Sequence, residues 1–209
     1  MNDRDWFRKG MKNRRPGCVM GLVMSVFMSG KYVLFAAVAG ISVLLDQLTK
    51  WWVVQYVGRA DEIEVIPGFL SVVHAKNPGA AFSALDEFEY RMYVFAAFTV
   101  VAVGVLLHTL RELREDERAQ TVAVGLLMGG AIGNGIDRVL YQEVTDFLRV
   151  YTEWSVIADP LRDWFGTSTW PIFNVADAAI VVGVIAFTVY FLFLEEREAP
   201  EDVELPQEA

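Results

Sequence analysis

Residues 92–110 read MYVFAAFTVVAVGVLLHTL, nineteen residues without an Asp, Glu, Lys or Arg. A helix needs about 20 mostly apolar residues to cross the hydrocarbon core of a bilayer. This stretch therefore predicts a membrane-spanning helix. Two later stretches predict the same, AQTVAVGLLMGGAIGNGI at residues 119–136 and AAIVVGVIAFTVYFLFL at residues 178–194.

A fourth span is predicted upstream of these three. Fourteen uncharged residues, 32–45, separate Lys31 from Asp46, which is short for a crossing. If the helix continues through DQLTKWWVV to Val54, it reaches full length and carries Asp46 and Lys50 near one end. The expected fold class is an all-α polytopic membrane protein with four transmembrane helices.

Composition supports a membrane protein and excludes several other classes. Hydrophobic residues make up 54% of the 209 residues and the mean hydropathy is +0.33, against roughly 45–50% apolar residues in a globular chain. The net charge of −9 argues against a nucleic-acid-binding protein. Cys18 is the only cysteine, so no disulfide forms within the chain, and with His74 and His108 it leaves no zinc site of the usual kind. We expect neither a metal ion nor a cofactor.

The basic residues predict which ends of the spans lie in the cytoplasm. Six Lys and Arg lie in the N-terminal arm, within residues 4–15, and three Arg lie in the connection 111–118. Because cytoplasmic segments near spans are rich in Lys and Arg, both segments lie inside, and four spans then place the C-terminus inside too. We divide the chain into an N-terminal cytoplasmic or interfacial extension (1–31), a four-helix membrane domain (32–194) and an acidic, disordered C-terminal tail (195–209).

One part of the extension has three interpretations. Residues 16–30, PGCVMGLVMSVFMSG, follow two arginines, as the core of a signal peptide would. They also suit part of an overlong first helix, or an amphipathic or interfacial leader. No small-x-small cleavage site precedes Lys31, so we favour the interfacial leader.

This topology leaves two external segments, residues 55–89 and 138–176. The first contains IEVIPGFLSVVHA at residues 63–75, whose β-branched residues and rough alternation predict a small extracytoplasmic sheet. The second is rich in tryptophan, a residue that favours the membrane–water interface.

Four aspartates are expected at one depth of the membrane. Asp46 lies in the last turns of the first span, Asp137 at the end of the third and Asp177 at the start of the fourth, so all three lie toward the outer face. Asp146 follows Asp137 by nine residues in the external segment, between apolar side chains. Acids among apolar neighbours are costly near lipid and are usually functional.

Salt bridges offer an alternative explanation for two of these acids. Asp46 has Lys50 four residues later on the same helix face, and Asp137 is followed directly by Arg138. For Asp46 and Asp137, ion pairing and a direct chemical role both stay open.

The charge of such a cluster determines its chemistry. Two carboxylates that share a site cannot both ionise cheaply, so one keeps its proton. The ionised member can then activate a water molecule while the protonated member polarises a carbonyl, which is the chemistry of aspartic peptidases and needs no metal. Ser83, Ser155 and Ser168 have no histidine partner in a recognisable arrangement, so the chain offers no better nucleophile.

Three asparagines are expected on the same side. Asn77 is in the first external segment, and Asn134 and Asn174 each precede an acid by three residues, which is one helical turn. Such amides can orient carboxylates. Helix capping explains Asn174 equally well, and close helix packing alone explains the glycines of GGAIGNG at residues 129–135.

Five motifs resemble those of one family. DQLTKWWV, NPGAAFS, GGAIGNGIDR, EVTDF and FNVADAAIVVG occur in the order seen in the bacterial lipoprotein signal peptidases, also called signal peptidase II or peptidase family A8. The resemblance runs from about residue 32 to residue 194, and five motifs in order are highly specific. It implies an aspartic endopeptidase of the bacterial inner membrane, with its active site near the outer face, that cleaves diacylglyceryl-modified prolipoproteins just before the lipidated cysteine.

The resemblance also implies roles for individual residues. Asp146 and Asp177 match the catalytic pair of the family. The residues that match those shaping or supporting that site are Asp46, Lys50, Asn77, Asn134, Asp137, Arg138, Asn174 and Ala176. Prolipoproteins, membrane lipid and globomycin-type inhibitors are the expected partners, and nucleic acid is not.

One departure from the family pattern concerns spacing. Asp146 and Asp177 are thirty-one residues apart, which looks longer than usual and indicates an insertion around residues 152–169. The insertion leaves both acids in place and changes the external segment. We expect the part around Trp154–Trp164 to close over the substrate as a lid.

Two other functions compete with proteolysis. A proton-coupled transporter also uses acids at membrane depth, but along a path through the bilayer and with inverted internal repeats, and none is visible here. The third hypothesis is a catalytically silent homologue that binds lipoproteins. The chain keeps every acid that the chemistry requires, which argues against it.

Overall fold

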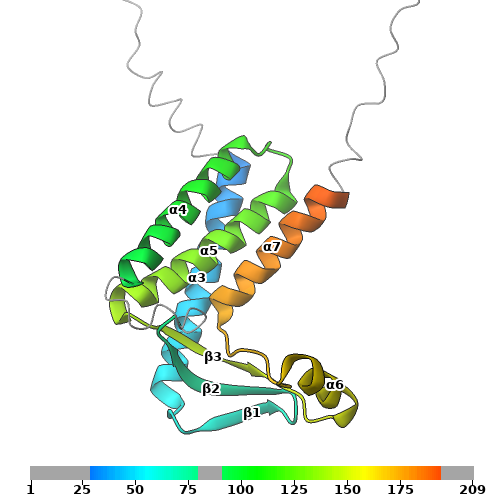
Figure 1. Cartoon of the computed structure of the whole chain (residues 1–209). Helices are drawn as coiled ribbons and strands as arrows, with labels where there is room; N and C mark the ends of the chain where they lie inside the picture. The colour runs from blue at the N-terminus through cyan, green and yellow to red at the C-terminus, as the bar shows by residue number, and fades with distance from the viewer. Residues whose placement is uncertain (1–28, 80–90, 194–209) are drawn as a thin grey trace, which may run out of the picture.

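Figure 1 shows the computed structural model, which describes residues 29–79 and 91–193. Four of its helices are long and apolar enough to cross a membrane, and they confirm the four predicted spans. These helices are α3 (Gly30–Tyr56), α4 (Arg91–Glu112), α5 (Arg118–Tyr141) and α7 (Val175–Phe193). Residues 1–28 of the predicted N-terminal extension, with most of the predicted leader at 16–30, and the predicted acidic tail lie outside the described residues. The last two residues of the extension, Gly30 and Lys31, belong to α3.

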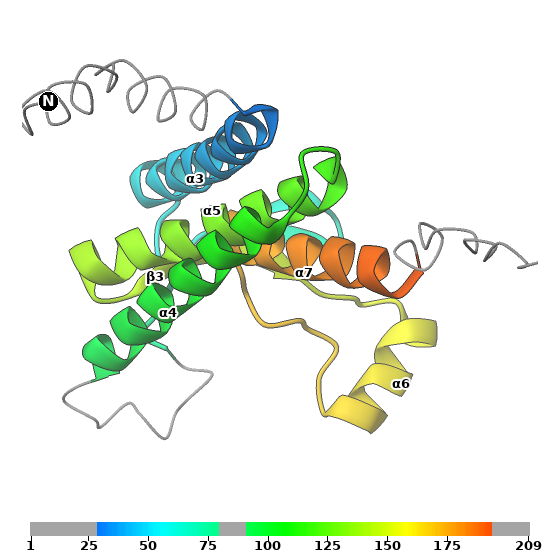
Figure 2. The same ribbon diagram turned by 90° about the horizontal axis from the view of Figure 1, so that it is seen from above.

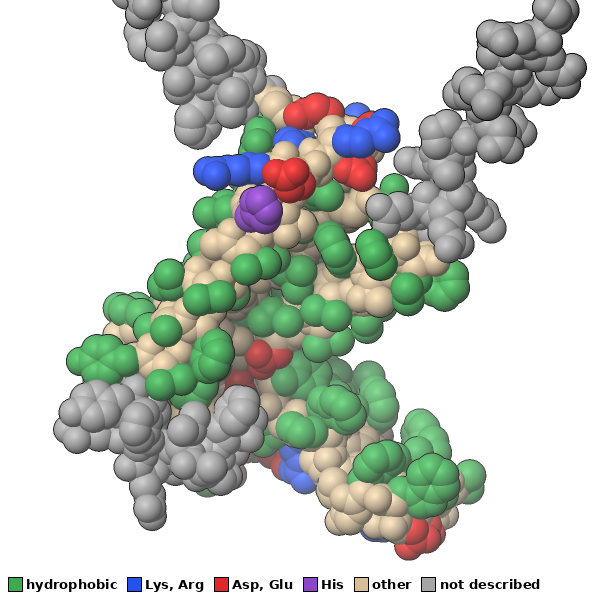
Figure 3. Space-filling view, turned by 45° about the horizontal axis from the view of Figure 1, so that its top comes forward, with side chains coloured by type: hydrophobic (Ala, Val, Ile, Leu, Met, Phe, Trp, Pro, Cys, Tyr) green, Lys and Arg blue, Asp and Glu red, His purple; other side chains and the backbone are tan. Residues whose placement is uncertain are grey.

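Helix α5 is central to the bundle. It packs against α3, α4 and α7, as the view in Figure 2 shows. In its most apolar stretch 56% of the residues are buried inside the protein, against 17% or less in the other three spans. The apolar side chains on the outside of the spans (Figure 3) suit contact with lipid.

Glycines let α5 approach its neighbours closely. A Cβ on Gly129 would collide with Ser42 of α3. A Cβ on Gly130 would lie 2.5 Å from Cγ1 of Ile180 in α7 and closer still to the carbonyl oxygen of Ala176. Neither position has room for a side chain, so the packing explanation for this glycine-rich stretch is confirmed.

Replacing Gly130 by alanine is therefore expected to lower the thermal midpoint of the detergent-solubilised protein. Overpacking of this kind costs roughly 1–3 kcal/mol, because the added methyl group forces α5 and α7 apart. Gly104→Ala in α4 is the matched control, since nothing lies within 4 Å of a Cβ built there. Equal thermal midpoints for the two variants would contradict the close contact.

The end of α5 differs slightly from the prediction. The helix continues past Asp137 and ends at Tyr141, because Gln142 adopts a left-handed conformation with φ of 61° and donates its N–H to the carbonyl oxygen of Arg138 at 3.1 Å. Asp137 and Arg138 therefore lie on the last turns of the span, and the external segment starts later than residue 138.

A three-stranded antiparallel sheet stands at one end of the bundle (Figure 1). It consists of β1 (Glu62–Ile66), β2 (Leu70–Asn77) and β3 (Val144–Val150), in that order. The first two strands confirm the small sheet predicted from the first external segment. Sequence analysis missed β3, because its first four residues are all buried and show none of the alternation that marks a half-buried strand.

The inserted residues leave this sheet and return to it. After β3 the chain forms α6 (Ser155–Phe165), and residues 168–173 then run back beside β3. The paired residues are Thr152 with Ser168, Tyr151 with Thr169, Val150 with Trp170 and Leu148 with Phe173. This return brings Asn174 next to Asp146, so the long spacing leaves the predicted site intact.

Helix α6 stands beside the end of β3 that is remote from Asp146. The cavity between α6 and the sheet is lined by Val150 and Tyr151, four and five residues after Asp146, or about 13–17 Å along an extended strand. The closing of this segment over the substrate as a lid stays a prediction.

The start of α3 is tied to the connection between α4 and α5. Lys31 is 8% exposed and its Nζ donates to the carbonyl oxygen of Arg111 at 3.3 Å. Ser29 Oγ donates to Glu115 Oε2 at 2.7 Å. These bonds hold the two segments at one end of the bundle, in keeping with the prediction that they lie on one side of the membrane.

Candidate active site

Lys50 lies at the centre of a buried charge cluster. Its Nζ is 2.8 Å from Asp46 Oδ2 and 3.2 Å from Asp137 Oδ2, and it donates to Asn134 Oδ1 at 3.0 Å. Asp46 is fully buried, and Lys50 and Asp137 are 4% and 2% exposed. The predicted pair of Asp46 and Lys50 is confirmed. Within the described residues Asp137 pairs with Lys50 and not with Arg138, so that alternative is wrong.

Further bonds join this cluster to α7 and to the sheet. Asp46 Oδ1 accepts the backbone N–H of Ala176 at 2.9 Å, and Asp137 Oδ2 accepts the backbone N–H of Thr145 at 3.0 Å. Gln47 donates to both carboxylates at 3.1 Å. Sequence reasoning missed Gln47, because consecutive residues of a helix do not share a face and only its long side chain reaches back.

Asn174 caps α7 and holds Asp177 in its first turn. The N–H of Asp177 donates to Asn174 Oδ1 at 2.9 Å, and the N–H of Asn174 donates to Asp177 Oδ2 at 3.2 Å. This reciprocal arrangement is a capping box, and the carboxylate also lies at the positive end of the helix dipole. The capping explanation for Asn174 is confirmed.

The side chain of Asn174 also reaches Asp146. Its Nδ2 donates to Asp146 Oδ1 at 2.7 Å and to Asn134 Oδ1 at 3.1 Å. Asn134 Nδ2 in turn donates to Asp177 Oδ1 at 2.7 Å. Asn174 is fully buried and a flipped amide would set oxygen against oxygen, so these bonds define its orientation. One asparagine therefore contacts both Asp146 and Asp177.

Both oxygens of the Asp146 carboxylate are hydrogen-bonded. Oδ1 binds Asn174, and Oδ2 accepts from Asn77 Nδ2 on the neighbouring strand at 2.9 Å. Asp146 is 3% exposed. Burial raises its pKa; the hydrogen bond from Asn77 opposes this, and the nearby carboxylate of Asp177 raises the pKa further. Two acids in this relation are suited to share one proton.

The predicted site residues converge in space. Nine of the ten form one continuous network of hydrogen bonds and ion pairs no longer than 3.2 Å, contributed by α3, α5, α7, β2 and β3. The tenth, Arg138, lies at its edge. Acids that are spread over 132 positions of the sequence, from Asp46 to Asp177, therefore meet at one end of the bundle.

Comparison with known proteins shows the family of the chain. Residues 38–193 match the profile of the family described as Signal peptidase (SPase) II. The chain belongs to this family. The lipoprotein signal peptidase of Geobacter metallireducens is 39% identical over 175 residues, covering 84% of this chain and 100% of that protein. The lipoprotein signal peptidase of Listeria welshimeri is 42% identical over 156 residues, covering 75% of this chain and 90% of that protein.

Two solved structures share the fold of this signal peptidase II chain. Both are bacterial membrane enzymes determined by the in meso method, one at 2.3 Å and one at 1.9 Å resolution. The first has a TM-score of 0.65 and 29% identity, covering 81% of this chain and 94% of that chain. The second has a TM-score of 0.64 and 31% identity, covering 76% and 92%. The signal peptidase II chain is thus a multi-pass membrane protease.

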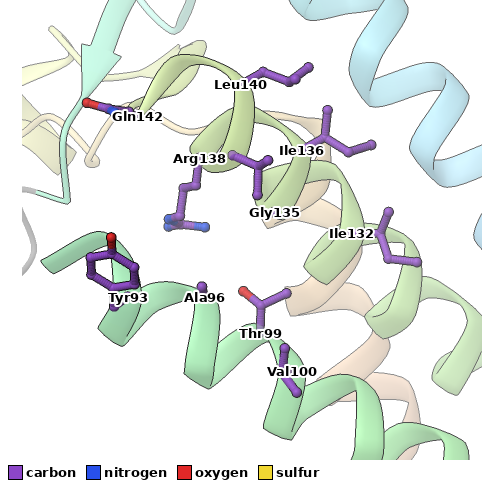
Figure 4. Close-up of a pocket in the computed structure, with 11 residues that line it drawn as sticks. Tyr93, Ala96, Thr99, Val100, Ile132, Gly135, Ile136, Arg138, Leu140 and Gln142 are labelled. Carbon is purple, nitrogen blue, oxygen red and sulfur yellow. The ribbon is translucent and has the colours of Figure 1, made fainter. Parts of the chain in front are cut away.

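Arg138 of this peptidase extends from α5 toward α4 and interacts electrostatically with Asp177, Asp146 and Asp137. Its Nη1 donates to the carbonyl oxygen of Asn134 at 3.4 Å, and its guanidinium lies 4.9 Å from the ring centre of Phe95. Figure 4 shows it extending from α5 toward Tyr93 of α4, into a pocket of about 700 Å³ between these helices. No hydrogen bond joins its described side chain to Asp146 or Asp177, and its part in the site stays a prediction.

Proposed function

We propose that this chain removes the signal peptides of diacylglyceryl-modified prolipoproteins, cutting immediately before the lipidated cysteine, with Asp146 and Asp177 as its catalytic pair. The family and the names of the relatives support the substrate class. The observation that carries the catalytic part is the double contact of Asn174. Its side chain donates to Asp146 and its backbone N–H donates to Asp177.

The proposed reaction uses one ionised and one protonated carboxyl group. The ionised group takes a proton from a water molecule as the water oxygen attacks the scissile carbonyl carbon, and the protonated group gives its proton to the carbonyl oxygen. The resulting tetrahedral diol collapses when a proton passes to the leaving nitrogen and the C–N bond breaks. The pair titrates as a unit, so the proton belongs to the pair and not to one residue.

The surrounding asparagines orient the carboxyl groups of Asp146 and Asp177. Asn134 and Asn174 hold the two carboxyl groups from the side of the helices, and Asn77 holds Asp146 from the sheet. Preorganised donors of this kind need no rearrangement during the reaction. The cluster around Lys50 supports the site indirectly, because it holds α3 and α5 to the first turn of α7.

The orientation of the chain in the membrane determines how the substrate reaches the site. We infer that the chain lies in the bacterial inner membrane with both termini in the cytoplasm and the sheet outside, in accord with the distribution of Lys and Arg. The substrate enters sideways and its acyl chains stay in the bilayer. We infer that an inhibitor of the globomycin type binds in the apolar pocket between α4 and α5, whose lining includes Arg138.

A cleavage assay tests the proposal. The detergent-purified protein is incubated with a diacylglyceryl-modified prolipoprotein, and the shift to the shorter form is followed on a gel. We expect cleavage before the modified cysteine, inhibition by globomycin, and no cleavage of the unmodified prolipoprotein. A folded protein that binds the substrate but never cleaves it would point to a silent lipoprotein-binding homologue.

Removal of the Asn77 hydrogen bond should move the pH profile. This bond favours the ionised form of Asp146 and so lowers its pKa. Asn77→Ala therefore raises the pKa, and the acid limb of kcat/KM moves to higher pH, by on the order of one pH unit for a hydrogen bond to a charged group.

The matched control is Ser71→Ala. Ser71 is fully buried on the same strand, and its hydroxyl binds Glu62 and not the paired acids. This variant should keep the acid limb of the wild type. An Asn77→Ala profile that stays in place or moves to lower pH would show that the bond does not act on Asp146.

A further inference from the structure

Several large apolar side chains of helix α6 are not covered by the rest of the protein. Ala158 is fully buried against the rest of the chain and Leu161 is half-buried. In contrast, Val156, Trp164 and Phe165 are 86%, 83% and 71% exposed. Large apolar side chains exposed together on one short helix indicate a surface that does not face water.

The charges of α6 lie on one side of the helix. At 100° per residue, Asp159, Arg162 and Asp163 project within one sector, and the opposite sector holds Ile157 and Trp164. Val156 projects between Trp164 and Asp163, at the edge of the charged sector. Figure 3 shows hydrophobic side chains gathered over α6 on the side toward the membrane-spanning helices, with acidic side chains on the side away from them. An amphipathic helix with this separation is suited to lie in a membrane interface.

The position of α6 in the fold agrees with this orientation. The chain runs from α6 through residues 166–174 directly into α7, a membrane-spanning helix. Figure 1 shows α6 just beyond the end of α7, on the side of the sheet. Trp154 and Trp170, which flank the helix, are 59% and 68% exposed, and tryptophan is enriched at this depth of a membrane.

The space beneath α6 is apolar as well. A cavity of about 480 Å³ separates α6 from the end of β3, and its lining includes Ile157, Phe165 and Trp170. Water inside it would find few polar partners. The apolar surface of α6 therefore continues under the helix and is not confined to its outer side.

We propose that α6 lies flat in the interface of the leaflet on the sheet side, with its apolar sector among the lipid chains and its charged sector in water. In this position α6 holds the far end of β3 at the membrane surface. Because Asp146 lies at the other end of the same strand, the contact sets the depth of Asp146 relative to the lipid. This inference depends on the membrane-spanning helices and not on the proposed cleavage.

Site-directed spin labelling in lipid nanodiscs tests the proposal. In a Cys18→Ser background, which removes the only native cysteine, Trp164→Cys and Asp163→Cys each receive one nitroxide. The nanodiscs contain phosphatidylethanolamine and phosphatidylglycerol. Power saturation then compares collision with oxygen, which concentrates in lipid, and with a nickel chelate, which stays in water. Neither substitution disturbs the packing of the protein, because Trp164 is 83% exposed and Asp163 is exposed as well.

We expect the ratio of oxygen to nickel accessibility to be severalfold higher at position 164 than at its neighbour 163. Equal ratios, with nickel reaching both labels, would overturn the proposal by showing α6 in water or locally unfolded. A label at position 164 that is shielded from both reagents would also overturn it, because a second copy of the chain or another protein would then cover this face. None of these outcomes depends on catalytic activity.

Discussion

Asp177→Asn is expected to abolish signal-peptide cleavage while the protein stays folded. The amide can neither take a proton from water nor give one to the scissile carbonyl, so kcat should fall on the order of 10³-fold or more. The fold survives because the N–H of residue 177 still donates to Asn174 Oδ1. In the wild type two N–H donors bind the Asp177 carboxylate, and in the variant the amide N–H₂ faces one of them. The loss of that hydrogen bond costs about 1–3 kcal/mol of folding stability. Cleavage rates and thermal unfolding of the same preparation measure the two effects.

Asp146→Asn should give the same loss of cleavage, since the reaction needs both carboxyl groups. The matched control is Asp159→Asn, which removes an exposed acid of α6 that has no part in the network around Asn174. That variant should cleave at the wild-type rate. If either Asp177→Asn or Asp146→Asn, correctly folded, cleaved close to the wild-type rate, the assignment of the pair would be wrong.

Lys50→Met is expected to destabilise the protein strongly. Lys50 is the cation between Asp46 and Asp137, and all three side chains are buried. Without it, two carboxylates face each other in a low-dielectric interior, and removing one partner of a buried pair costs roughly 3–5 kcal/mol. The loss should appear as a lower midpoint of thermal or denaturant unfolding in detergent.

Two further variants separate this effect from a general loss of charge. Arg114→Met breaks an ion pair with Asp116 in which both side chains are about two-thirds exposed (68% and 66%), so it should cost less than about 1 kcal/mol. Adding Asp46→Asn to Lys50→Met should recover part of the stability, because one unpaired carboxylate is removed. A Lys50→Met protein as stable as the Arg114→Met protein would contradict the buried cluster.

The spans were predictable because the length and apolarity that a bilayer requires apply to each segment separately. A run of apolar residues of sufficient length must form a helix, whatever the rest of the chain does. The expected ends of α3, α4, α5 and α7 therefore agree with the structure to within a few residues. The same rule places Asp46 and Asp177 at one end of the bundle, since the topology alternates with each crossing.

The small external elements were harder to predict. β3 is buried along its first half and has no alternation, and α6 is an eleven-residue helix with a proline at position 160. Both depend on partners far away in the sequence. The partner of Asp137 was missed for the same reason. Its sequence neighbour Arg138 turns toward α4, and Lys50 arrives from α3.

By itself, the sequence determined the number of spans, the positions of the acids along them, and, through its five motifs, the family. Only the tertiary structure decided that Asn174 holds Asp146 and Asp177 together. That contact requires residues 168–173 to return beside β3 after the excursion through α6. Strand pairing across such a loop depends on the packing of the whole bundle end, and no local pattern of residues specifies it.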